Sequence, residues 1–119
     1  MADTITWLTL MPRIELAKNT LGQAITIAEQ RMNTGQVVLA HPVFEWAQAA
    51  HTDLDAFLIK IVNEPAMSAP AKIAVTVNNA SEGITTAFAA QDYGKLIQHS
   101  RLLLDALPGD PTIPFPIEI

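Results

Sequence analysis

The sequence predicts an all-α fold, an antiparallel bundle of three or four helices followed by an extended, proline-rich C-terminal arm. Two stretches, 10–32 and 42–63, carry apolar residues at steps of three and four, which is the period of an amphipathic helix. A third region, 70–107, has the same period and forms either one long helix or two. Three prolines then exclude helix from the chain end. We therefore expect a helical bundle domain at 1–109 and a separate arm at 110–119.

The stretch 42–63 has the clearest helical pattern, and the bundle is expected to be organised around it. Pro42 suits the first helical turn, where a missing N–H has no cost. Residues 52–55 resemble a capping box, which leaves open a break near His51. The apolar face holds two large aromatic side chains, so other elements should pack on it. This face comprises Val43, Trp46, Ala50, Leu54, Phe57 and Ile61.

A second helix is predicted over 12–32, with Gly35 placed where a helix commonly ends. Residues 3–11 mix helix and strand preference, so an extension of this helix through them, with a kink at Pro12, stays open. The apolar bridge 37–40 is too short to assign. The expected stripe of the helix comprises Leu10, Ile14, Ala17, Leu21, Ala24, Ala28 and Met32.

Residues 72–77 fit two patterns. They alternate strictly between apolar and other residues, which is typical of a strand. They also begin a series of three- and four-residue steps that continues to Ala87, which is typical of a helix. An isolated pair of strands is marginally stable, so we favour helix and keep an α+β fold with a strand at 72–77 as the alternative. Residues 87–107 are predicted to be helical, with Gly94 as a place where the region divides.

The arm differs from the rest of the chain because its prolines favour extended or polyproline conformations. Its large apolar residues alternate with Pro or Glu and would share one side of an extended strand. Disordered tails are usually polar, so this apolar segment is expected to dock in a groove, on its own bundle or on a neighbouring subunit. The predicted protein-interaction residues are Ile113, Phe115, Ile117 and Ile119.

The composition also favours assembly. Half of the residues are hydrophobic and only 16% are charged, against about 25% in an average soluble domain. Such a small domain leaves apolar surface uncovered unless a partner covers it, although a monomer with an Ala- and Thr-rich surface is the alternative. The net charge is −5 and the seven Lys and Arg residues are scattered, which disfavours nucleic acid as a partner.

Other classes are excluded by what the sequence lacks. There is no cysteine, so disulfides, thiolate catalysis and zinc–sulfur sites are excluded. No signal-peptide pattern and no apolar run long enough for a membrane span occur, so we expect no membrane and a cytoplasmic protein. The sequence has no Glu-x-x-His pair, no Gly-x-Ser-x-Gly motif and no glycine-rich phosphate loop. We therefore predict no enzyme, no catalytic or metal-binding residue and no cofactor; an ionisable site, if present, would comprise Glu45, His51 and Asp55.

The sequence does not identify a reaction, and the favoured function is structural. We expect a non-catalytic assembly subunit of a homo-oligomer or larger complex, such as a shell or virion-like particle, with the arm docked on a neighbouring subunit. The alternative is a small regulatory or adaptor protein that binds a partner helix or peptide in a groove, with the arm folded back on its own chain. An enzyme or small-molecule carrier is the third hypothesis.

Overall fold

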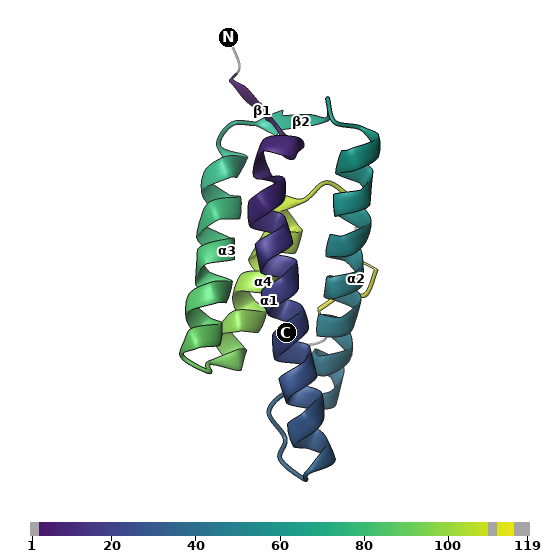
Figure 1. Ribbon diagram of the computed structural model, residues 1–119, viewed down its shortest axis with the longest axis vertical. Coiled ribbons are helices and arrows are strands. Elements are labelled where there is room, and N and C mark those ends of the chain that lie inside the picture. The colour runs from purple at the N-terminus through teal and green to yellow at the C-terminus, as the bar shows by residue number, and fades with distance from the viewer. Residues whose placement is uncertain (1–2, 110–111, 116–119) are drawn as a thin grey trace.

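The computed structural model describes residues 3–109 and 112–115. Within them the chain is mostly helical, with four helices and one small two-stranded sheet, which confirms the predicted predominance of helix. The elements, in chain order, are β1 Thr4–Thr6, α1 Trp7–Asn33, α2 His41–Asn63, β2 Ser68–Pro70, α3 Ile73–Ala89 and α4 Tyr93–Ala106 (Figure 1).

The helices lie side by side, with α1 antiparallel to α2 and α3 antiparallel to α4 (Figure 1). Helix α1 packs extensively against both α2 and α3, and α3 packs extensively against α4. Contacts between α2 and α4 are much sparser. Three helix pairs are therefore tightly packed, and the fourth junction, between α2 and α4, is loose.

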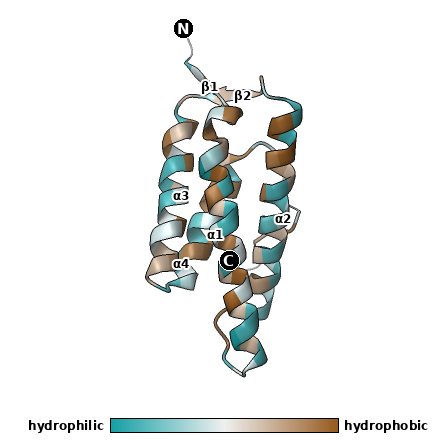
Figure 2. Cartoon of the chain, viewed as in Figure 1, coloured by the Kyte–Doolittle hydropathy of each residue, from teal (hydrophilic) through white to brown (hydrophobic). Residues whose placement is uncertain are grey.

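The core is built from the apolar stripes of the helices. Every residue of the predicted face of α2 is buried, as are the predicted positions of α1 up to Ala28. Trp7 and Phe57 meet edge to face, with their ring centroids 5.0 Å apart. Figure 2 shows hydrophobic and hydrophilic residues alternating along each helix, as amphipathic helices require. The largest fully buried apolar side chains are Ile14, Leu21, Leu54, Ile61, Ile84, Leu96 and Leu103.

Helix α1 begins at Trp7, five residues before the predicted start at Pro12, so that start was wrong, and the alternative of an extension through residues 3–11 holds as far as Trp7. Trp7, which is only 2% exposed, fixes the first turn in the core. Pro12 lies inside the helix and cannot donate a hydrogen bond to the carbonyl of Leu8. Leu8 is 46% exposed and Pro12 is also exposed, so the missing hydrogen bond lies on the solvent-facing side of the helix.

The alternative of a strand at 72–77 was also wrong, since α3 begins at Ile73. The small sheet lies elsewhere: β1 pairs antiparallel with β2, with Ile5 opposite Ala69. Its second strand falls in the segment after α2, and the sheet lies at the end of the molecule where α1 and α3 begin (Figure 1). Side-chain burial therefore decided the conformation of α3, because Val77, Ala80 and Ile84 reach the core only from a helix.

Two predicted break points also differ from the structure. Helix α2 continues through His51, and the Thr52 hydroxyl donates within the helix to the carbonyl of Gln48 at 3.2 Å. The region after α3 divides before Gly94, because Gln91 has a positive φ of 58°. The Asp92 side chain then caps α4 by accepting the backbone N–H of Lys95 at 3.1 Å.

Candidate functional site

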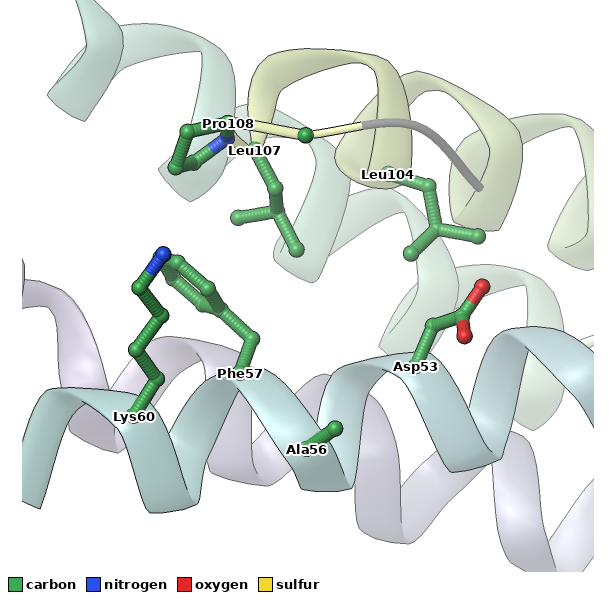
Figure 3. A pocket seen from close by; sticks show the side chains of 8 residues that line it. Asp53, Ala56, Phe57, Lys60, Leu104, Leu107 and Pro108 are labelled. Atoms are coloured by element: carbon green, nitrogen blue, oxygen red, sulfur yellow. The ribbon is translucent and has the colours of Figure 1, made fainter. Parts of the chain in front are cut away.

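The loose junction between α2 and α4 contains two hollows. We call this junction, with Trp46, Asp53 and Phe57 on one wall and Arg101 and Leu104 on the other, the α2/α4 seam. The smaller hollow, about 220 Å³, lies toward the end of α4. Figure 3 shows side chains of α2 and of the α4 end pointing toward one another across it. The larger hollow, about 660 Å³, lies toward the start of both helices.

The described part of the arm, residues 112–115, lies on the seam between these hollows, and its first contact is a polar clamp. The backbone N–H of Thr112 donates to Oδ2 of Asp53 at 2.9 Å. The Thr112 hydroxyl donates to Oδ1 of the same carboxylate. Asp53 is half-buried, so one carboxylate accepts two charge-assisted hydrogen bonds from a single arm residue. The clamp therefore requires both a hydroxyl side chain and a free backbone N–H at this position of the arm.

The second contact is aromatic. Phe115 is half-buried, and its ring meets Trp46 of α2 edge to face, with centroids 5.1 Å apart. The guanidinium carbon of Arg101, on α4, lies 4.5 Å from the centroid of the same ring. An aromatic pair is worth about 0.5–1.5 kcal/mol beyond burial, and a cation–π contact at an exposed site about 0.5–1 kcal/mol. Phe115 therefore connects the two walls of the seam.

The two contacts are separated by the same distance along α2 and along the arm. Asp53 and Trp46 are seven residues apart on α2, so they share a face and are separated by about 10.5 Å along the axis. Thr112 and Phe115 are three residues apart, which spans roughly 9–10 Å in an extended or polyproline segment. The arm therefore runs opposite to α2 and reaches both partners without distortion. Pro114, between the two contacts, restricts the free segment and lowers the entropy lost on docking.

The predicted interaction residues have different environments. Phe115 lies in the seam, whereas Ile113 is 40% exposed. Ile117 and Ile119 lie outside the described residues. Thr112 and its partner Asp53 were missed, because a prediction based on apolar alternation gives no weight to a polar pair. The one feature of the sequence that points to this pair is a match of lengths. Seven residues of helix, from Trp46 to Asp53, are about as long as three extended residues, from Thr112 to Phe115, and this match can be recognised only after the arm is placed on α2.

The ionisable residues singled out from the sequence have separate neighbours. Glu45 pairs with His41 at 3.0 Å, and Asp55 pairs with Lys18 of α1 at 3.2 Å. His51 packs against α1. Across residues 3–109 and 112–115, no group of three His, Cys, Asp or Glu side chains is placed to hold a metal ion. The same ranges contain no helix that is both long and apolar enough to cross a membrane.

Comparison of the chain with protein-family models, with curated proteins and with solved structures finds no match in any of the three. Function is therefore argued from the geometry of the α2/α4 seam and of the arm. The arrangement can bind an extended segment through one carboxylate and one aromatic pocket.

Proposed function

We propose that the chain is a non-catalytic assembly subunit whose extended, Pro-rich C-terminal arm docks in the α2/α4 seam of a neighbouring copy. The observation that carries this proposal is the paired contact of Thr112 with Asp53 and of Phe115 with Trp46 and Arg101. A neighbouring copy offers the same partners at the same spacing. Exchange of arms between copies therefore keeps every contact that the arm makes in its own seam.

The linker before the arm supports this exchange. Helix α4 ends at Ala106, and Pro108 and Gly109 follow before the arm. Gly109 has a φ of 98°, which a glycine adopts without strain, so this residue can serve as a hinge between α4 and the arm. A change at that hinge lets the arm leave its own seam while the helices stay packed. Repetition of such exchange around a ring or shell would join many copies through one type of contact.

Exposed apolar side chains on the helices also support assembly. Single exposed apolar residues are ordinary on a monomer, but here they occur on all four helices and on the connector before α2. In an assembly, contacts that form when arms are exchanged would cover part of this surface. The large apolar residues that are more than 40% exposed are Leu8, Leu16, Val37, Ile59, Val62, Val75 and Leu102.

The proposal is tested by mass over a concentration series, with light scattering on the full chain and on a chain ending at residue 109. We expect the full chain to form oligomers and the shortened chain to be a folded monomer by circular dichroism. A labelled synthetic peptide of residues 110–119 should bind the shortened chain, and the same peptide carrying Phe115→Ala should bind much more weakly. Equal masses for the two chains at all concentrations would contradict the proposal.

A regulatory or adaptor protein is the second candidate, and the location of the contacts within one chain favours it. In this case the arm covers a groove that otherwise holds a partner helix or peptide, and partner binding displaces Phe115 from Trp46. A full chain that stays monomeric, with its arm protected from proteases, would support this candidate over assembly. Both candidates retain the expectation of a cytoplasmic protein, free or built into a particle.

A further inference from the structure

Exposed apolar side chains gather on one outer face of the bundle. Of the eight large apolar residues that are exposed within the described ranges, four come from the first half of α1 or the last turns of α2. Met11 and Pro12 lie among them on α1. We call this surface the α1/α2 outer face, and it comprises Leu8, Met11, Pro12, Leu16, Ile59 and Val62.

An ion pair fixes how the two helices meet under this face. Nζ of Lys18 on α1 lies 3.2 Å from Oδ1 of Asp55 on α2. The helices are antiparallel (Figure 1), so a step back along α1 matches a step forward along α2. Met11 is seven residues, or two turns, before Lys18, and Val62 is seven residues after Asp55. Met11 and Val62 therefore face the same groove between the helices at the same level.

The face has the anatomy of a protein interface. A hollow of about 470 Å³ opens on α1, with Leu8 and Met11 in its lining. Its polar lining residues, Glu15 and Asn19, lie further along α1, toward the ion pair of Lys18. An apolar centre with a polar rim is the usual arrangement of a surface that binds another protein.

We propose that the α1/α2 outer face binds the same face of a second copy, with Ile59 and Val62 of each subunit entering the hollow on α1 of the other. This inference deepens the proposed function and rests on it, since arm exchange is the first contact between copies and this face is the second. The charges of the face favour a second copy, because Lys18 and Asp55 neutralise each other and Glu15 is the charged residue in the lining of the hollow. Two such faces therefore meet with little repulsion, although each chain has a net charge of −5.

The size of the face indicates that it acts together with the arm. From Leu8 to Asn19, α1 extends about 16 Å, and two neighbouring helices are about 20 Å wide, which gives roughly 300 Å². A stable interface buries about 800 Å² on each partner. The face alone is therefore too small to join two copies, in agreement with the monomer expected for the chain ending at residue 109. It contributes once arm exchange has raised the local concentration of copies, and a subunit with two different contacts joins more than two copies.

Light scattering on the full chain tests the inference. Ile59→Lys places a charge in the face, and Val37→Lys is the control, because Val37 is exposed and belongs to the connector before α2. At the same concentration we expect an average mass at least two-fold lower for Ile59→Lys and an unchanged mass for Val37→Lys. Oligomers of the same mass in both variants would overturn the inference and leave arm exchange standing, whereas a monomeric unsubstituted chain would overturn both.

Disulfide trapping provides a second measurement, because the chain has no cysteine of its own. A full chain carrying Leu8→Cys is mixed under mild oxidation with a chain carrying Ile59→Cys or, as the control, Val37→Cys. We expect several-fold more mixed disulfide, identified by mass, with Ile59→Cys. Val37 is 78% exposed and Ile59 is 56% exposed, so accessibility alone would favour the control. Equal or lower trapping with Ile59→Cys, as expected if the face binds a different protein, would overturn the inference.

Discussion

His99 of α4 packs directly on Gly83 of α3. A Cβ added to Gly83 would lie 2.5 Å from Nδ1 and 2.6 Å from Cγ of the His99 ring. Because Cγ lies on the Cβ–Cγ bond, rotation of the ring about that bond leaves Cγ in place and cannot remove the contact. The absence of a side chain at Gly83 therefore sets how closely α3 and α4 approach, and this pair is among the most extensively packed in the molecule.

Gly83→Ala should destabilise the fold. Overpacking costs about 1–3 kcal/mol, and the better helix propensity of alanine returns about 1 kcal/mol. We expect a net loss of up to about 2 kcal/mol in the free energy of unfolding, measured by urea denaturation. The control is Gly94→Ala in α4, where the nearest atom lies 3.7 Å away, so alanine should be neutral or stabilising. Addition of His99→Ala to Gly83→Ala should restore stability. Equal stability of Gly83→Ala and its control Gly94→Ala would contradict this packing.

Asp53→Ala should release the arm. The substitution removes both acceptors of the Thr112 clamp, so the amide of Thr112 should lose protection from hydrogen exchange and the arm should be cut faster by proteases. Global stability should fall by less than about 1 kcal/mol, because the clamp is near the surface. The matched control is Asp55→Ala, two residues away, which breaks only the pair with Lys18. Equal release of the arm by both variants would argue against a specific clamp.

The central helix could be predicted from the sequence because local periodicity determines it. Pro42 and the apolar stripe of α2 act through neighbours three or four residues away, and the structure has the same helix to within one residue. The start of α1 could not be predicted in this way. Burial of Trp7 against Phe57, a contact between distant positions, outweighs the penalty of Pro12 inside a helix. Similarly, the closeness of Gly83 to His99 depends on how two helices meet.

The arm was predicted from its prolines and apolar residues, and this prediction did not include the partners of Thr112 and Phe115. Apolar alternation indicates that a segment needs cover, and it contains no information about which surface supplies it. Asp53, Trp46 and Arg101 are separated in sequence and come together only when α2 and α4 form two walls. The predominance of helix was therefore accessible from local pattern, whereas the seam depends on tertiary packing.

Phe115→Ala should change the environment of Trp46. Trp46 is 3% exposed, and the Phe115 ring packs on it at right angles. Removal of the phenyl ring should admit water and shift the tryptophan emission to longer wavelength. A Trp7→Phe background isolates the signal, and Trp7 itself packs on Phe57. Ile113→Ala, at a residue that is 40% exposed, is the control and should leave the emission unchanged. A spectrum unaffected by Phe115→Ala would show that the ring does not dock in solution.

Ser81→Ala should weaken the packing of α3 on α1. Ser81 is fully buried, and its hydroxyl donates to the backbone carbonyl of Arg13 on α1 at 3.0 Å. Loss of this bond leaves a carbonyl without that donor and should cost about 1 kcal/mol. Ser100 is equally buried, but its hydroxyl bonds within α4 to the carbonyl of Leu96, so this bond joins no second helix. Ser100→Ala should therefore cost less, because a serine hydroxyl bonded to the carbonyl four residues earlier slightly destabilises its own helix. Urea denaturation of both variants measures the difference, and a larger loss for Ser100→Ala would show that the Ser81 bond does not hold the two helices together.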